Sequence, residues 1–170
     1  MTSRDNEHDH VDAVVEQWRR ERPDLDTTAM ASLGRLARVQ RLVTKRLEDV
    51  FAEHELESWE FDVLATLRRA GPPHALTPGS LLEQMMLSSG AMTNRIDRLA
   101  ARGLVERRPH PDDGRAVLVA LTDQGFERIE RAVTDHVANE LDILSHLDES
   151  QQAELDMLLR RLLGALDPEA

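Results

Sequence analysis

Residues 88–115 read SSGAMTNRIDRLAARGLVERRPHPDDGR, and this stretch decides the fold. In its first half, Met92, Ile96 and Leu99 follow the i, i+4, i+7 spacing that gives a helix one apolar face. Gly103 is suited to end this helix, because glycine readily adopts the left-handed conformation found after helix ends. The stretch therefore predicts a short amphipathic helix that stops before a second element.

The opposite face of this predicted helix is small and polar. At about 100° per residue, four residues point away from the apolar stripe: Gly90, Thr93, Asn94 and Asp97. Ser88 or Ser89 is suited to cap the N-terminus of the helix. A face of this kind fits the major groove of duplex DNA without a steric clash.

A hairpin is expected directly after the helix. Residues 104–109 and 116–121 are strand-like, and the Pro-Asp-Asp-Gly sequence at 111–114 has turn chemistry. Arg115 would lie near the tip, where it suits the narrow, electronegative minor groove. Such a segment by itself is also compatible with an ordinary surface hairpin, but the helix before it favours a DNA-binding wing. The expected DNA contacts are Ser88, Ser89, Gly90, Thr93, Asn94, Arg98, Arg108, Asp113 and Arg115.

Length and composition limit the alternatives. A chain of 170 residues has about the length of one domain, so we expect one compact unit. The polar N-terminus and the lack of a long apolar run predict a soluble, cytoplasmic protein without membrane contact. The chain has no cysteine, which excludes disulfides and thiolate metal sites. Its histidines lack metal-ligand spacing, so neither a metal nor a cofactor is expected.

The charge distribution matters more than the net charge of −11. Residues 88–120 hold six arginines against four acidic residues, a charge of +2, whereas residues 121–170 hold four arginines against twelve acidic residues, a charge of −8. The acidity therefore lies away from the predicted DNA surface. Phosphate contact is compatible with this pattern, with weak non-specific affinity and strong salt dependence.

Helical periodicity and capping residues organise the rest of the chain. Helices are expected at about residues 9–22, from a cap at Asp26 or Thr27 to His54, from a cap at Ser58 to Ala70, from Thr77 to Met86, from a cap at Thr122, and from Asp148. The fold class is thus mainly α with a small β-hairpin wing, a winged helix-turn-helix. We expect an N-terminal extension helix at 1–26, dimerisation helices at 27–56 and 122–170, and a DNA-binding lobe at 57–121.

The two terminal helices carry a leucine stripe that implies a partner. A symmetric homodimer would match a palindromic DNA operator with half-sites about 10 bp apart. The alternative is that these helices pack on the core of one monomer.

The quoted helix resembles that of the MarR family of bacterial transcription regulators. The resemblance extends to GLVERR at 103–108, DDGR at 112–115 and Leu121-Thr122, and covers about residues 27–165. It implies a homodimeric winged-helix repressor. The DNA affinity of such a repressor falls when a small anionic aromatic ligand binds between the dimerisation region and the DNA-binding lobes.

The extension helix, with VEQW at 15–18 and RPDLD at 22–26, is similar to the urate-responsive branch of this family. That resemblance implies a ligand site formed by Trp18, Asp62, Arg95 and Arg107. Urate is a flat monoanion with ring N–H donors, so an aromatic face, arginines and a carboxylate suit it. Arg95 lies at the edge of the buried helical stripe, and Arg107 shares strand parity with Val105, so we expect it to face inward.

Several alternatives stay open at this point. Trp18 could only pack the extension helix, and Asp62 with Arg95 could form an ion pair that locks the recognition helix. The effector could be a different aromatic acid or an antibiotic, or the winged helix could bind proteins instead of DNA. An enzyme is not expected, because no nucleophile–base pair, paired carboxylates or phosphate loop occurs at a usable spacing.

Overall fold

The computed structural model describes residues 8–85, 92–111 and 116–167, which fall into two compact units with a boundary between Arg46 and Leu47. The sequence led us to expect one compact unit, and the expected segment limits at residues 26, 56 and 121 stay a prediction. The boundary between the two units lies inside one helix, because the last turns of that helix pack within the second unit: the Phe51 ring stacks on Phe61 with centroids 4.1 Å apart.

The first unit pairs two helices, α1 (His10–Glu21) and the first part of α2 (Thr28–Glu53). The Asp9 carboxylate caps α1 by accepting hydrogen bonds from the backbone N–H groups of Val11 and Asp12. Val11 and Val15 are buried. Gly34 permits this packing, since a Cβ there would lie 3.0 Å from Val11 Cγ1. The expected extension helix is confirmed.

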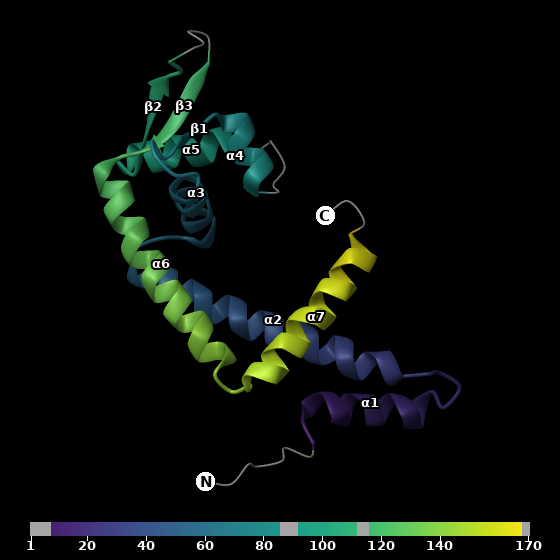
Figure 1. Ribbon diagram of the computed structural model, residues 1–170. Coiled ribbons are helices and arrows are strands. Elements are labelled where there is room, and N and C mark those ends of the chain that lie inside the picture. Colours follow the sequence, from purple (N-terminus) through teal and green to yellow (C-terminus); the bar gives the residue numbers. More distant parts are fainter. Residues whose placement is uncertain (1–7, 86–91, 112–115, 168–170) are drawn as a thin grey trace. The chain divides into compact units, whose positions relative to one another are not determined.

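The second unit holds a helix-rich lobe and two long helices (Figure 1). Its remaining elements are α3 (Ser58–Arg69), β1 (Ala75–Leu76), α4 (Pro78–Met85), α5 (Met92–Ala101), β2 (Val105–Pro109), β3 (Val117–Leu121), α6 (Asp123–Leu144) and α7 (Glu149–Leu166). The three strands form one antiparallel sheet in the order β1-β3-β2. The expected class, mainly α with a small hairpin, is confirmed.

The core of the second unit joins α3, α5, the sheet and α6. Leu64, Leu67 and Leu99 are fully buried, as is Ile129 on α6. Gly125 allows α6 to start against the segment between α5 and β2, because a Cβ at this position would lie 1.9 Å from the carbonyl oxygen of Leu104. This packing fixes the recognition helix against the scaffold.

Most expected boundaries agree with the structure. Thr122 and Asp148 cap α6 and α7 as expected, and Gly103 ends the α5 segment with φ +69°. The cap of α3 is Glu57 and not Ser58, since Glu60, three residues along the helix, accepts the Glu57 backbone N–H at 2.9 Å. No helix in the part of the chain described is both long and apolar enough to cross a membrane.

Two differences concern the wing and the recognition helix. The sequence did not reveal β1, because its two residues are too few to show a strand period. The expected start of the recognition helix and the tip of the hairpin lie outside the described residues. The expected contacts Ser88, Ser89, Gly90, Asp113 and Arg115 fall there.

Candidate nucleic-acid interface and anion site

The helix α5 is amphipathic in the way the sequence predicts. Met92, Ile96 and Leu99 are buried, while Thr93 and Asn94 are exposed on the opposite side. Asp97 and Ala101 share that exposed face. The helix α4 packs against α3 and α5, as the first helix of a helix-turn-helix does. The helix-turn-helix formed by α4 and α5 therefore presents the exposed polar face of α5.

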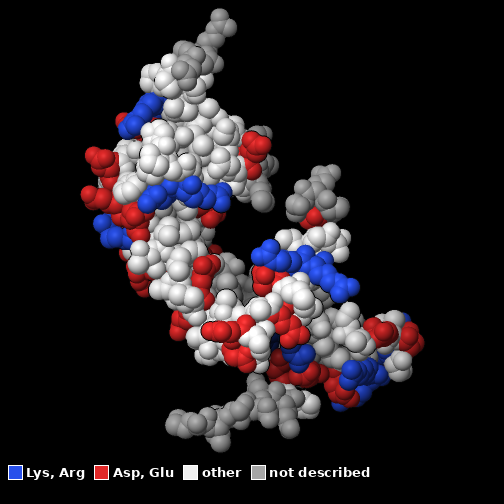
Figure 2. Space-filling model, in the orientation of Figure 1, with Lys and Arg blue, Asp and Glu red and all other residues white. Residues whose placement is uncertain are grey.

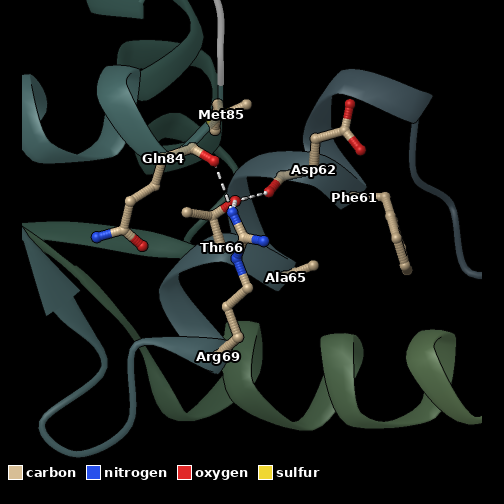
Figure 3. Close-up of a pocket in the computed structure, with 7 residues that line it drawn as sticks. All are labelled: Phe61, Asp62, Ala65, Thr66, Arg69, Gln84 and Met85. Carbon is tan, nitrogen blue, oxygen red and sulfur yellow. Dashed lines mark hydrogen bonds between the residues drawn. The ribbon is translucent and has the colours of Figure 1, made fainter. Parts of the chain in front are cut away.

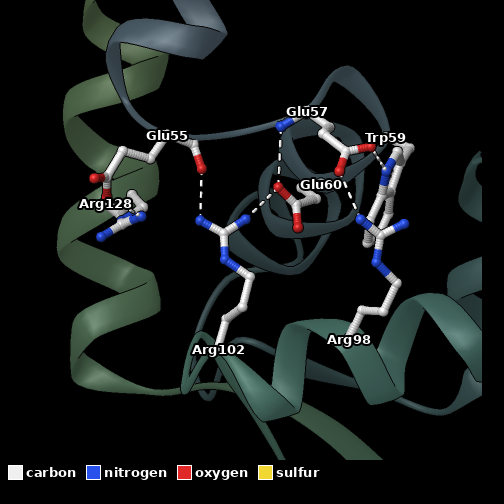
Figure 4. Close-up of polar contacts among 7 residues, drawn as sticks. All are labelled: Glu55, Glu57, Trp59, Glu60, Arg98, Arg102 and Arg128. Carbon is white, nitrogen blue, oxygen red and sulfur yellow. Dashed lines mark hydrogen bonds and ion pairs between the residues drawn. The ribbon is translucent and has the colours of Figure 1, made fainter.

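The arginines of α5 lie between its buried and exposed faces and meet the N-terminal end of α3 (Figure 4). Arg98 donates to Glu57 Oε1 at 2.6 Å, and its guanidinium lies 4.7 Å from the centroid of the Trp59 ring. Trp59 Nε1 in turn donates to Glu57 Oε2 at 2.7 Å. Arg98, an expected DNA contact, is thus positioned by α3 while its side chain stays half exposed.

A buried acid holds the C-terminal end of α5. Glu60 is 1% exposed, and its Oε2 forms an ion pair with Arg102. A second nitrogen of Arg102 donates to the carbonyl oxygen of Glu55 at 2.6 Å. Because Glu60 is buried, removal of Arg102 would leave its charge without this cation and would destabilise the folded state. Sequence reasoning missed this pair, although a glutamate among the apolar residues of α3 was a usable signal.

Acidic and basic side chains lie next to one another on the visible face of the molecule (Figure 2). The same pattern holds on the wing, where Arg108 donates to Glu106 at 2.7 Å. Within the described residues there is no group of three or more acidic, histidine or cysteine side chains placed to hold a metal ion.

An open cavity of about 410 Å³ lies between α3 and the end of α4 (Figure 3). Its lining residues are Phe61, Asp62, Ala65, Thr66, Arg69, Gln84 and Met85. Arg69 closes one side by donating to the Gln84 carbonyl at 2.7 Å. Burial raises the pKa of Asp62, and the positive charges of Arg95, His136 and Arg69 act in the opposite direction.

Comparisons with known proteins identify the class of regulator. Residues 54–116 match the sequence profile of the MarR family. The chain is 44% identical over 152 residues to the HTH-type transcriptional regulator PecS of Dickeya dadantii, covering 89% of this chain and 92% of that protein. The chain belongs to the MarR family.

Other relatives agree with this assignment. The multiple antibiotic resistance protein MarR of Escherichia coli is 33% identical over 135 residues, which cover 77% of this chain and 90% of that protein. The crystal structure of mutant MarR C80S from E. coli in complex with operator DNA matches with a TM-score of 0.67 at 30% identity, covering 81% of this chain and 97% of that one. This MarR-family chain is a DNA-binding transcriptional regulator and not an enzyme.

The residues that the MarR-family resemblance assigned to a ligand site differ from one another in their surroundings. Asp62 and Arg95 lie close enough for the charge of Arg95 to lower the pKa of Asp62. Arg95 also faces the ring of Trp59, with 5.6 Å between its guanidinium carbon and the ring centroid. Trp18 belongs to the first unit, where its side chain is 44% exposed.

Arg107 extends toward α5 but is not buried. Its side chain is 42% exposed and forms an ion pair with Asp97 on α5, with 2.7 Å between Nη1 and Oδ1. Val105, with the same parity, is buried, but every later residue of β2 is exposed. Only the first residue of the strand contributes to the core, so parity alone does not determine burial along the wing.

Proposed function

We propose that this MarR-family chain is a homodimeric, ligand-responsive repressor. In this proposal it binds a palindromic operator and leaves it when urate or a related planar anion binds near the recognition helix. The observation that carries the proposal is Asp62, which lines the cavity between α3 and α4 and lies near enough to Arg95 on α5 for that charge to act on its pKa. A carboxylate at an open cavity with a guanidinium in its neighbourhood suits a ligand that has both ring N–H groups and a negative charge.

Arg95 provides the link between ligand and DNA. Because this residue belongs to α5, an anion that engages its guanidinium acts directly on the helix that carries the exposed polar face. A coupling of about 1–3 kcal/mol changes DNA affinity by roughly tenfold or more. Trp18 and Arg107 complete the proposed ligand set through the family resemblance, Trp18 as the aromatic face and Arg107 as a second cation.

The long C-terminal helices support a homodimer. No residue of α7 is buried, although the helix is rich in leucine. The large apolar side chains of α6 and α7 that remain exposed are Val137, Leu141, Leu144, Leu155, Met157, Leu158, Leu159, Leu162, Leu163 and Leu166. A second copy would remove this surface from water, and the resulting two-fold symmetry would match a palindromic operator.

A second candidate differs only in the effector. The 33% identity to the multiple antibiotic resistance protein MarR favours another aromatic acid or an antibiotic as the ligand. The cavity then holds a carboxylate-bearing aromatic compound in place of a purine.

An electrophoretic mobility shift assay tests both candidates. The full chain is bound to the promoter DNA that flanks its own gene, and urate and then salicylate are titrated into the complex. Release by urate at concentrations where salicylate has no effect supports the proposal, and the reverse order supports the second candidate. Absence of a shifted complex at low salt would contradict operator binding.

Variants locate the effector site. Asp62→Asn and Arg95→Ala are expected to reduce urate binding in isothermal titration calorimetry by about tenfold, because each removes a charged partner. Arg131→Ala, which removes an exposed arginine on α6, serves as the matched control and should bind urate normally. Wild-type affinity in both site variants would show that the ligand binds elsewhere.

A further inference from the structure

The exposed face of α5 carries a negative charge, which is unexpected on a surface that meets DNA. Asp97 lies on this face with Thr93 and Asn94, and its side chain is 57% exposed. DNA presents one negative charge per roughly 1.7 Å of helix axis. An unpaired carboxylate at this position would therefore repel the phosphates on either side of the groove.

The wing supplies the compensating charge. Arg107 Nη1 lies 2.7 Å from Asp97 Oδ1 in an ion pair, although the two residues belong to different elements, β2 and α5. The backbone of Arg107 is held opposite Val119 in the β2–β3 ladder, and Val119 is fully buried. The β2–β3 pairing thus fixes the backbone position of Arg107, while its side chain extends to α5.

Neighbouring arginines have other acidic partners. Arg98 is bonded to Glu57, Arg102 to Glu60, and Arg108 to Glu106. Among the described residues, the cation that forms an ion pair with Asp97 is Arg107. This pairing gives Arg107 a function in DNA binding that needs neither an effector nor a direct contact with the duplex.

We propose that Arg107 supports DNA binding by masking the charge of Asp97. On this account Arg107 is a positioning residue that acts through Asp97. Two other roles are chemically reasonable and make opposite predictions. Arg107 could contact a phosphate itself, or Asp97 could accept a hydrogen bond from the amino group of a cytosine in the major groove.

A double-mutant cycle on the full chain separates these roles. Affinity for the promoter duplex and for a duplex of random sequence is measured by fluorescence anisotropy without effector, for the wild type, Arg107→Gln, Asp97→Asn and the double variant. Asp156→Asn on α7 controls for the loss of one negative charge, and circular dichroism confirms that each variant is folded.

Charge masking predicts a characteristic pattern. Arg107→Gln should weaken binding to both duplexes by about three- to tenfold, because it exposes the carboxylate. Asp97→Asn should bind as tightly as the wild type or more tightly, and the double variant should return to within about twofold of Asp97→Asn. Any gain in DNA affinity from Asp156→Asn should be smaller than the gain from Asp97→Asn.

Three results would overturn the proposal. A double variant that binds as weakly as Arg107→Gln would show that Arg107 contacts DNA directly. Weaker binding by Asp97→Asn, confined to the promoter duplex, would show that Asp97 reads a base. Unchanged binding by Arg107→Gln would show that the charge of Asp97 does not matter. Because no effector is used, failure of the proposed urate response leaves this test intact.

Discussion

Individual side chains at the N-terminal end of α3 determine how the recognition helix, α5, is held. Glu57 and Glu60 bond to Arg98 and Arg102, so the carboxylates that lock α5 differ from Asp62, which sequence reasoning had considered for that role. Asp62 is left at the rim of the cavity with a raised pKa. Among the described residues no cation is bonded to this acid, so the proposed ligand has access to it.

Asp62→Asn is expected to stabilise the protein at neutral pH. Burial raises the pKa of Asp62, so the folded state disfavours the charged form and the stability contributed by this group falls as pH rises through that pKa. Thermal unfolding should show a small increase in Tm at about pH 7 that shrinks at about pH 3, where the carboxyl is protonated in both states.

Asp24→Asn is the matched control for this measurement. The bond from Arg22 lowers the pKa of Asp24, so its charged form is favoured in the folded state and the substitution should not raise Tm at neutral pH. Equal increases in both variants would show that loss of net negative charge, and not the burial of Asp62, is the cause.

At the scale of elements, the fold depends on a few close approaches between helices. The first turn of α6 passes directly over Leu104, the residue before β2, and Gly125 is the position at which they meet. Gly164 also lies within a helix, but a Cβ there would have nothing within 4 Å. The two glycines therefore form a matched pair.

Gly125→Ala should destabilise the protein by about 2 kcal/mol or more, because the new methyl group would overlap a backbone carbonyl that cannot move without shifting β2. Gly164→Ala should instead stabilise α7 by about 0.5–1 kcal/mol through its helix propensity. Urea unfolding of both variants checks the difference, and equal effects would contradict the packing of α6 against Leu104.

The packing of α1 on α2 is expected to depend on pH. Arg35 donates to Asp9 at 2.9 Å and to Asp12 at 2.6 Å. Its bond lowers the pKa of Asp12 to about 2 and also lowers the pKa of Asp9. Their contribution to stability is thus fully present above the usual carboxyl pKa of about 4 and is lost as pH falls below it.

Arg35→Gln should move the release of α1 to higher pH, measured by hydrogen exchange of its amides between about pH 6 and pH 2. Arg19→Gln is the control, because the pair of Arg19 with Glu16 lies within α1 and does not reach α2. If Arg35→Gln left the pH of release unchanged, the carboxylate–arginine contacts would not hold the helix pair.

At the scale of the whole molecule, the acidic C-terminal segment differs in character from the DNA-binding lobe. Residues 121–170 contain α6 and α7, whose exposed apolar side chains support the proposed dimer. The DNA-binding lobe instead neutralises its arginines with nearby acids. This division lets one chain offer both a surface for a second copy and a surface for DNA.

Leu158→Glu should convert the proposed dimer to a monomer, because it places a charge in the middle of the apolar stripe of α7. Analytical ultracentrifugation would show the change, and operator affinity should fall by about tenfold or more as one half-site is lost. Arg160→Glu, about 160° around the same helix from Leu158, should leave the sedimentation coefficient unchanged. A Leu158→Glu variant that sediments like the wild type would exclude α7 from the interface.

Local patterns in the sequence determined the helices, their ends and the family of this protein. Helix periodicity and capping depend on residues a few positions apart, which is why the cap at Thr122 and the start of the last helix at Asp148 were predicted correctly. The helix and wing motif was equally local, and it carried the resemblance to the MarR family.

Only the tertiary structure decided which charges meet. The bond between Glu60 and Arg102 joins residues 42 positions apart, and the bond between Asp97 and Arg107 joins a helix to a strand. The two-residue strand β1 likewise exists because it pairs with β3. Periodicity describes one element at a time, whereas ion pairs and edge strands depend on how elements approach one another in space.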